Sequence, residues 1–245
     1  MRDETFAVEA AIEAEHWWFV GRRRLFADEI ARCRIVPEAR ILDLGTSTGT
    51  NLRMLREAGF RNVVGVDSSE EALRWCRTKH LDNVVKGDIT RLPFPDGQAD
   101  LVLATDVIEH LADDRPAIRE IVRVLKPGGV VLIAVPAFQL LWGLQDEVAE
   151  HKRRYRKRDV ERILTDAGLM IERSYYFNYL LFLPILLARV VLRFLPGAVS
   201  SENEVNSPLI NRILKRIFAF DVASAPLIRP PFGVSALVLA TKPAR

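Results

Sequence analysis

The stretch Arg40-Ile-Leu-Asp-Leu-Gly-Thr-Ser-Thr-Gly-Thr-Asn51 decides the fold class of this chain. A short apolar run enters a turn bounded by Gly45 and Gly49, and a helical pattern follows over residues 51–58. A strand, a glycine turn and a helix form the repeating unit of parallel sheets. The free N–H groups at the start of such a helix can receive a polar or anionic ligand, although the turn by itself is also a common connector.

The same alternation of strand-like and helix-like segments continues along the chain. Apolar runs that end in turn residues alternate with amphipathic segments, which predicts parallel pairing through right-handed crossovers. The predicted strands are 40–45, 62–67, 83–88, 99–104, 129–135, 169–177 and 233–241. The predicted helices between them are 51–58, 69–79, 115–125 and 158–167.

Two regions lie outside this alternation. Residues 1–36 form a predicted helical prelude, broken around Val20 and Gly21 and ended before Pro37, and residues 178–232 interrupt the pattern before the last strand. A chain of 245 residues, 49% of them hydrophobic, can close one sizeable core. We therefore expect a single domain: a prelude or lid (1–36), a cofactor-binding core (37–177), a helical insertion (178–232) and a final strand (233–245).

Composition argues against several classes of protein. The two cysteines, Cys33 and Cys76, cannot supply a disulfide framework or a metal site, so reduced thiols and no bound metal are expected. The residues after Met1 lack the basic and apolar pattern of a secretory signal, which favours a cytoplasmic location.

Asp67 closes the second predicted strand, 67 − 43 = 24 positions after Asp43. An acidic side chain there can accept hydrogen bonds from both hydroxyls of a ribose. A dinucleotide enzyme would share this aspartate but would use a G-x-G-x-x-G turn, whereas Ser47 and Thr50 occupy the corresponding positions here. The pattern thus favours an adenosine cofactor without a pyrophosphate.

Five ordered motifs together resemble the class I S-adenosylmethionine-dependent methyltransferases. They are Asp43-Leu-Gly-Thr-Ser-Thr-Gly49, Val66-Asp67, Gly87-Asp88-Ile89, Ala104-Thr-Asp-Val-Ile-Glu-His110-Leu111 and Leu125-Lys-Pro-Gly-Gly129. The resemblance implies a Rossmann-like, doubly wound, seven-stranded α/β sheet whose last strand is antiparallel, with S-adenosyl-L-methionine as cofactor.

The resemblance also implies roles for individual residues. Gly45 and Gly49 bound the cofactor turn, Asp67 holds the ribose, Asp88 and the Ile89 backbone meet the adenine, and Thr105 and Asp106 line the methionine end. The full set expected at the cofactor is Asp43, Gly45, Thr46, Ser47, Gly49, Asp67, Ser68, Asp88, Ile89, Thr105 and Asp106. Thr46 and Ser47 depart from the family pattern of a small residue or Cys followed by Gly.

Methyl transfer from a sulfonium is an in-line displacement in which the protein aligns the nucleophile and, where needed, removes its proton. His151, just beyond the fifth strand, is the first candidate for a catalytic base, because histidine titrates near physiological pH. His110, after the fourth strand, is the second. A surface position for His151 and a structural role for His110 remain open alternatives.

Candidates for substrate or lid contacts come from two clusters. Trp17, Trp18 and Arg22 belong to an aromatic and basic patch in the prelude, and Arg154 and Tyr155 belong to a basic run that favours an anionic partner. Ordinary packing and a solvated charged face are the alternatives. The segments His16-Trp-Trp-Phe19, Asp146 to Tyr155 and Pro231-Phe-Gly-Val-Ser235 resemble a bacterial methyltransferase subgroup found beside envelope glycosyltransferases, which implies a small-molecule, sugar or lipid-linked substrate.

The insertion raises the question of membrane contact. Residues 174–188 are uncharged but too short to span a bilayer. A helix beginning at Pro208 is expected to place Leu209, Ile210, Ile213, Leu214, Ile217 and Phe218 on one side and Arg212, Lys215 and Arg216 on the other. Peripheral contact of residues 178–220 with the inner membrane face is one interpretation. Packing over the active site or in a homodimer is the other.

The sequence therefore predicts a methyltransferase acting on a small-molecule, sugar or lipid-linked acceptor. The alternative is a non-catalytic, membrane-associated scaffold that binds the same cofactor. Nucleic acid is a disfavoured partner, because no nucleic-acid-binding module and no base-methylating motif of the Asn-Pro-Pro-Tyr type is present.

Overall fold

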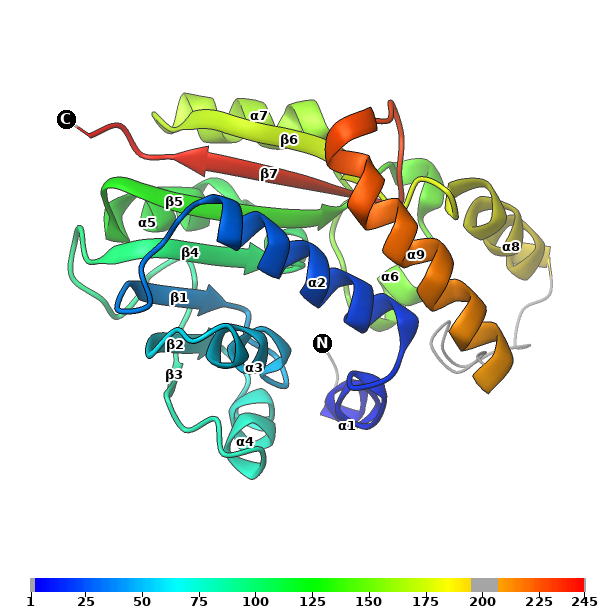
Figure 1. Ribbon diagram of the computed structural model, residues 1–245, viewed down its shortest axis with the longest axis horizontal. Coiled ribbons are helices and arrows are strands. Elements are labelled where there is room, and N and C mark those ends of the chain that lie inside the picture. The colour runs from blue at the N-terminus through cyan, green and yellow to red at the C-terminus, as the bar shows by residue number, and fades with distance from the viewer. Residues whose placement is uncertain (1–2, 195–206, 245) are drawn as a thin grey trace.

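The structure is a computed structural model that describes residues 3–194 and 207–244. Its centre is a seven-stranded sheet with the order β3-β2-β1-β4-β5-β7-β6 (Figure 1). β7 runs antiparallel to both of its neighbours, and the other pairs are parallel. The strands are β1 (Arg40–Leu44), β2 (Asn62–Asp67), β3 (Val84–Lys86), β4 (Ala99–Thr105), β5 (Leu125–Pro136), β6 (Met170–Phe177) and β7 (Ser235–Thr241). The predicted Rossmann-like fold, including its antiparallel last strand, is confirmed.

The strand order reverses at β1, which lies between β2 and β4. The chain first winds outward from β1 through β2 to β3, and it then returns to the other side of β1 to form β4 and β5. The connections on the two sides leave in opposite directions, so a crevice opens at the carboxyl ends of β1 and β4.

Helices cover both faces of the sheet (Figure 1). One face carries α2 (Trp17–Arg32), α3 (Thr50–Glu57) and α9 (Pro208–Ile228), and the other carries α5 (Arg115–Val124) and α7 (Lys157–Asp166). The remaining helical segments are α1 (Asp3–Ile12), α4 (Glu70–Thr78), η1 (Ile108–His110), η2 (Gln139–Leu141), α6 (Leu144–Val148) and α8 (Phe182–Phe194).

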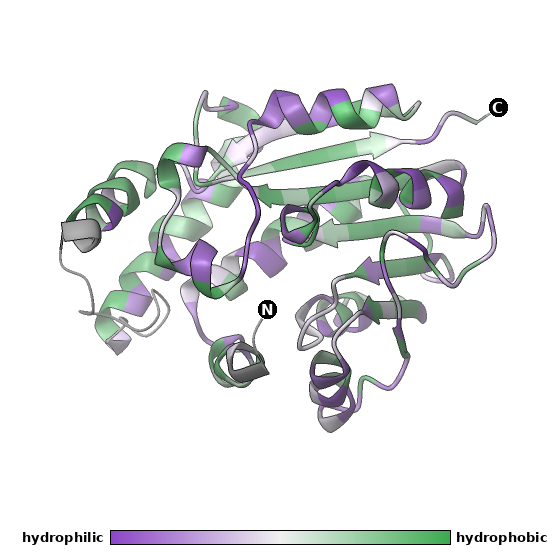
Figure 2. Cartoon of the chain, turned by 180° about the vertical axis from the view of Figure 1, so that it is seen from behind, coloured by the Kyte–Doolittle hydropathy of each residue, from purple (hydrophilic) through white to green (hydrophobic). Residues whose placement is uncertain are grey.

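Two hydrophobic clusters fill the space between sheet and helices. Successive residues of β1 alternate between them: Ile41 packs in the cluster that contains Phe26 of α2, whereas Leu42 packs in the cluster that contains Ile118 of α5. The inner strands β1, β4 and β7 are buried on both faces over most of their length, which explains why they read as nearly continuous apolar runs. Figure 2 shows the same contrast between apolar strands and helices of mixed polarity.

The predicted break in the prelude is wrong. The chain leaves helical geometry after Ile12 and resumes it at Trp17, and Gly21 lies inside α2. A Cβ atom on Gly21 would stand 2.2 Å from Cδ1 of Phe218. Glycine is therefore required at this position for close packing of α9 against α2, and it does not interrupt the helix.

The start of β5 also differs from the prediction. The segment Lys126-Pro-Gly-Gly129 was expected to end a helix before a strand at residue 129, but β5 already begins at Leu125. The Gly128 N–H donates to the Lys242 carbonyl at 2.8 Å, and the Lys242 N–H donates to the Gly129 carbonyl at 2.9 Å. Pairing with the segment after β7 thus extends the strand through a sequence that resembles a turn.

The insertion contributes α8 and α9, and residues 195–206 of the expected insertion lie outside the described part of the chain. α9 has two apolar sides where the sequence predicted one. Phe218 and Val222 are buried under α2, whereas Leu209, Ile213 and Phe220 are exposed. Among residues 3–194 and 207–244, no helix combines the length and the hydropathy that a membrane crossing requires.

Candidate active site

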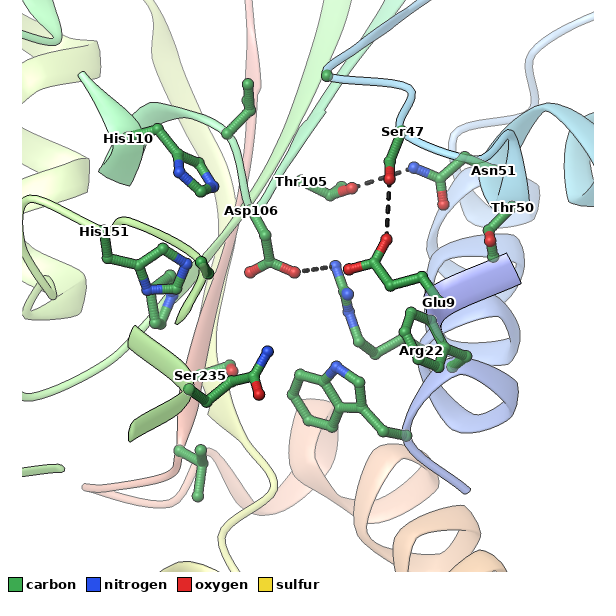
Figure 3. Close-up of a pocket in the computed structure, with 18 of the residues that line it drawn as sticks. Glu9, Arg22, Ser47, Thr50, Asn51, Thr105, Asp106, His110, His151 and Ser235 are labelled. Atoms are coloured by element: carbon green, nitrogen blue, oxygen red, sulfur yellow. Dashed lines mark hydrogen bonds and ion pairs between the residues drawn. The ribbon is translucent and has the colours of Figure 1, made fainter. Parts of the chain in front are cut away.

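A cavity of about 980 Å³ opens at the carboxyl ends of β1, β2 and β4. Its wall continues over residues of α1, α2, α8 and α9, all of which come from the two regions outside the regular alternation. Figure 3 shows polar side chains that converge on the cavity from the cofactor turn, from the end of β4 and from α1 and α2. The cavity thus occupies the crevice at which doubly wound sheets bind ligands.

The cavity lining contains most of the residues singled out from the sequence. They are Trp17, Trp18, Arg22, Gly45, Thr46, Ser47, Asp67, Ser68, Asp88, Ile89, Thr105, Asp106, His110, His151 and Arg154. Asp43, Gly49 and Tyr155 lie outside the lining.

Two glycines determine the shape of the turn after β1. Gly45 has a φ of 69°, and a Cβ atom there would lie 2.6 Å from Cγ2 of Val107. Gly49 has a φ of 86° and is the N-cap of α3, and a Cβ atom there would lie 2.5 Å from Cδ1 of Leu81. A side chain at either position would combine left-handed backbone strain with a steric clash.

Asp43 supports this turn from below. Its buried carboxylate accepts hydrogen bonds from Oγ1 of Thr46 at 2.7 Å and from Nδ2 of Asn51 at 2.9 Å. Asn51 also donates to Oγ1 of Thr105 at 3.0 Å, which joins the turn to the end of β4 (Figure 3). Burial raises the pKa of Asp43 to about 6, although the two hydrogen bonds act in the opposite direction.

Asp67 lines the cavity at the end of β2. One carboxylate oxygen accepts the Ser47 N–H and the other accepts the Ser69 N–H, both at 2.9 Å. Burial raises the pKa of Asp67, and these backbone hydrogen bonds oppose that shift. A carboxylate has about four acceptor positions, so both oxygens can still accept hydrogen bonds from the hydroxyls of a ribose. Asp88 and Ile89 line the same end of the cavity.

Arg22 brings a positive charge to the centre of the cavity. Its guanidinium forms an ion pair with the carboxylate of Asp106, as Figure 3 shows. The Arg22 Cζ atom lies 5.2 Å from the ring centroid of Trp18 and 5.1 Å from that of Phe26, which holds the side chain in place. The Nε atom of Arg22 is buried and has no hydrogen-bond partner within the described residues, so the guanidinium retains a donor.

Two glutamates that sequence reasoning did not single out cover the cofactor turn: Glu9 lies in α1, and Glu13 directly follows it. Glu9 accepts a hydrogen bond from Oγ of Ser47 at 2.9 Å. The buried Glu13 accepts from Oγ1 of Thr50 at 2.8 Å and from Nζ of Lys79 at 2.7 Å, and it also contacts the Thr48 hydroxyl. Their four-residue spacing was the available signal, because it places both carboxylates on one face of a helix.

His151 is held by a buried acidic group, on the opposite side of the cavity from Ser47 (Figure 3). Its Nδ1 lies 2.8 Å from Oδ1 of Asp146, and Nε of Arg154 donates to the same oxygen at 2.8 Å. Burial alone would raise the pKa of Asp146, but the His151 hydrogen bond and the Arg154 charge lower it to about 2. Asp146 is therefore a permanent anion that orients the imidazole.

His110 and Glu109 complete this end of the cavity. The imidazole rings of His110 and His151 meet edge to face with centroids 4.8 Å apart. Burial, together with the nearby His151, lowers the pKa of His110 to about 4. Glu109 is fully buried, and burial raises the pKa of its carboxyl well above the ordinary value. Its position directly before His110 was the only sequence signal.

The basic run around Tyr155 is largely engaged within the protein. Arg154 is buried and pairs with Asp146, Arg153 lies 3.7 Å from Asp114, and Lys157 pairs with Glu161 at 2.7 Å. The Tyr155 hydroxyl donates to Asp114 at 2.7 Å below the site. Arg154 is the member of this run that lines the cavity.

The comparisons with known proteins agree with this geometry. The family described as "Methyltransferase domain" matches residues 42–133, from β1 into β5. A probable S-adenosylmethionine-dependent methyltransferase of Mycolicibacterium smegmatis is 27% identical over 161 residues, which cover 64% of this chain and 61% of the relative. A demethylmenaquinone methyltransferase of Renibacterium salmoninarum is 34% identical over 113 residues, which cover 46% of each protein. The chain thus spans only about half the length of these relatives.

Solved structures extend the likeness to the fold of the whole chain. The methyltransferase complexed with the Trm112 activator of Haloferax volcanii has a TM-score of 0.66 at 22% identity, over 99% of this chain and 96% of that one. A methyltransferase from Archaeoglobus fulgidus has a TM-score of 0.58 at 22% identity, over 90% and 94%. The methyltransferase-domain match over residues 42–133, the ordered motifs and the sheet order together support a class I S-adenosylmethionine-dependent methyltransferase.

Proposed function

We propose that the protein transfers a methyl group from S-adenosylmethionine to a small-molecule acceptor that binds between the two histidines and α8. The observation that carries this proposal is one continuous cavity that joins the carboxylates of β2 and β3 to the imidazoles of His110 and His151. A cofactor site and an acceptor site must share one space if a methyl group is to pass between them in line.

The residues at the first end fit the cofactor by their chemistry. Asp67 has free acceptor positions for the ribose hydroxyls, Asp88 and Ile89 would meet the adenine, and Arg22 would pair with the cofactor carboxylate. Gly45, Thr46, Ser47 and Ser68 would surround the sugar, with Thr105 and Asp106 at the methionine end. When bound, the cofactor supplies an electrophilic methyl group on a sulfonium.

The protein's own residues prepare the acceptor. His151 is oriented by Asp146, and His110 lies beside it, so that this end of the cavity can withdraw a proton from an acceptor hydroxyl or amine. Trp17 and Trp18, together with the ordered α1, would exclude water from the reacting groups.

The acceptor is proposed to be partly apolar. Ile185, Leu187, Ala188 and Val191 of α8 and Leu214 of α9 line the cavity, and Arg154 and Arg189 lie at the border of this apolar wall. A molecule with a hydrocarbon part and a polar or anionic part would match both the apolar wall and the two arginines. The names of two relatives, which specify demethylmenaquinone and malonyl-[acyl-carrier protein], support an acceptor of this general kind, lipid-linked molecules included.

Residues 1–36 and 178–232 are then the lid and the acceptor cover of a single domain whose core is 37–177 with the strand 233–245. Exposed apolar side chains continue from this cover onto the surface: Leu183, Leu187 and Val190 of α8 and Leu209, Ile213 and Phe220 of α9. Figure 2 shows α8 as a largely apolar helix at one end of the molecule. With the exposed Arg212 and Arg216, this surface supports peripheral contact with an anionic membrane.

Two measurements test the proposal. The protein is incubated with methyl-labelled S-adenosylmethionine and either a demethylated quinol or a polyprenyl-linked sugar, and the label is expected in the lipid fraction. Intact cofactor binding without transfer to any small or lipid-linked acceptor would favour the scaffold alternative. Flotation with vesicles containing anionic lipid tests membrane contact, and failure to float at low salt would refute that part alone.

A further inference from the structure

Three metal-ligating side chains meet at the acceptor end of the cavity. Glu109 and His110 belong to η1, directly after β4, and His151 follows α6. One ligand atom from each of the three lies within 4.8 Å of the other two. Donor atoms that coordinate one cation stand about 3 Å apart, so small rotations of these side chains suffice to close a coordination sphere.

Glu109 gives an independent reason to expect a ligand. Its side chain is fully buried, and neither carboxylate oxygen has a hydrogen-bond partner among the described residues. Nε2 of His151 is 3.9 Å from Oε1 of Glu109, which is too long for a hydrogen bond. Burying an unsatisfied carboxylate is costly, and a cation between Glu109 and the two imidazoles would satisfy it.

The surroundings of both histidines match those of metal ligands. A metal-bound imidazole usually engages its second ring nitrogen with a carboxylate or a backbone carbonyl. Nδ1 of His151 is held by Asp146 at 2.8 Å, which leaves Nε2 directed toward Glu109. The His110 ring interacts with the backbone of Ala149. His151 therefore has one ring nitrogen fixed by a hydrogen bond and one available to the cluster, and the His110 ring lies beside it with ring centroids 4.8 Å apart.

The charges nearby favour a cation at this point. Arg154, 2.8 Å from Asp146, and Arg189, 3.6 Å from it, compensate the charge of the Asp146 carboxylate. Asp106 adds a second carboxylate at the same end of the cavity, and it is paired with Arg22.

We propose that Glu109, His110 and His151 bind one divalent first-row transition cation, for which Zn²⁺ is the best match. Two imidazoles and one carboxylate form a known catalytic zinc set and leave at least one coordination position open. His110 and His151 line the cavity, so the open position faces the acceptor. This site departs from the sequence-based expectation of no metal, because residues 110 and 151 are 41 positions apart in the chain.

The role of the cation rests on the proposed function. An acceptor hydroxyl coordinated to a divalent cation loses its proton far more readily than in water, and the proton passes to solvent. The acceptor oxygen would then form a bond to the methyl carbon as the CH₃–S bond of the sulfonium breaks, and the neutral thioether would leave. His151 and His110 act in this arrangement through the cation, as ligands.

The site is tested by metal binding alone, without cofactor or acceptor. Chelator-treated protein is titrated with Co²⁺, whose visible absorption reports coordination, and Zn²⁺ is added as a competitor. One equivalent of Co²⁺ should bind, and Zn²⁺ should displace it. Glu109→Gln and His151→Asn should each weaken binding by about 100-fold or more. The matched control is His80→Asn, since His80 is exposed and lies outside the cavity.

The outcomes separate this inference from the proposed function. S-adenosylmethionine binding, measured on every variant, reports whether the fold and the cofactor site are intact. Absence of saturable Co²⁺ absorption in the wild-type protein would overturn the metal site and leave the methyltransferase proposal standing. Retention of binding in both Glu109→Gln and His151→Asn, or its loss in His80→Asn, would also overturn it. Co²⁺ binding without cofactor binding would count against the proposed function alone.

Discussion

The two ends of the cavity are built in different ways. The proposed cofactor end consists of residues at or just after the ends of β1, β2 and β3, such as Gly45, Asp67 and Asp88, so the sheet itself fixes their positions. The acceptor end is assembled from η1, the loop after α6, and α8, which are far apart in the chain. Positions set by strand ends can therefore stay the same in different proteins of this fold, whereas the loops and helices that line the proposed acceptor end can differ between them.

The largest effect should come from removing the acceptor of the ribose hydroxyls. Asp67→Ala deletes a carboxylate that also accepts the N–H groups of Ser47 and Ser69, so cofactor affinity should fall at least about 100-fold, or about 3 kcal/mol. Calorimetric titration measures this change. Co²⁺ binding at the acceptor end should persist if the two ends are independent. Asp96→Ala, at an exposed carboxylate, is the control, and wild-type-like cofactor affinity in Asp67→Ala would contradict the site assignment.

A matched pair of glycines tests how tightly the cofactor end is constrained. Gly45→Ala adds strain at a φ of 69° and places Cβ 2.6 Å from Val107, whereas Gly97→Ala meets strain at a φ of 61° with nothing within 4 Å. We expect Gly45→Ala to lower the free energy of unfolding by about 3 kcal/mol and Gly97→Ala by about 1 kcal/mol. Denaturant unfolding of both variants measures the difference, and equal losses would show that the Val107 contact relaxes freely.

The positions of the side chains at the proposed cofactor end were largely predictable from the sequence. Asp43, the two turn glycines and Asp67 follow short strands with a strong local pattern, and a parallel sheet brings strand ends together regardless of the loops. The contact between Glu109 and His151 was not predictable, because it depends on the path of the chain between β5 and α7. Gly21 was misread for a related reason: glycine marks both helix ends and close contacts, and the sequence does not say which applies.

Gly21 also allows the acceptor cover to be loosened selectively. In Gly21→Ala the new methyl group would stand 2.2 Å from the buried ring of Phe218, so α9 should shift away from α2. This shift should lower the free energy of unfolding by about 2 kcal/mol. The double variant Gly21→Ala/Phe218→Leu replaces the ring with a smaller side chain, and it should regain part of the lost stability. Thermal unfolding measures stability, and cofactor titration measures whether the effect stays at the acceptor cover. A fall in cofactor affinity as large as in Asp67→Ala would contradict the separation of the two ends.

The smallest effect concerns pH and the docking of α1. Glu9 contacts Ser47, faces Arg22 and Asp106 across the cavity, and shares its helix face with Glu13. Burial raises its pKa to about 7, so the folded state holds this proton more tightly than the unfolded state between about pH 4.5 and 7. Stability contributed by Glu9 should therefore decline as pH rises through that range and stay constant above it.

Glu9→Gln removes this titration and keeps a side chain able to bond with Ser47. Its free energy of unfolding should equal that of the wild type near pH 4.5 and exceed it by about 1–2 kcal/mol above pH 7. Unfolding by denaturant at several pH values measures both proteins. Parallel pH profiles for the two proteins would show that Glu9 does not titrate in this range.

The position of β7 constrains the order in which the molecule can fold. β7 fills the gap between β5 and β6, and it is separated from β6 by the segment that contains α8 and α9. During synthesis, the edges of β5 and β6 that pair with β7 therefore stay unpaired until residues 235–241 leave the ribosome. The sheet closes only after both helices of the acceptor cover have emerged, so a ribosome that stalls within α9 would expose two strand edges that are able to aggregate.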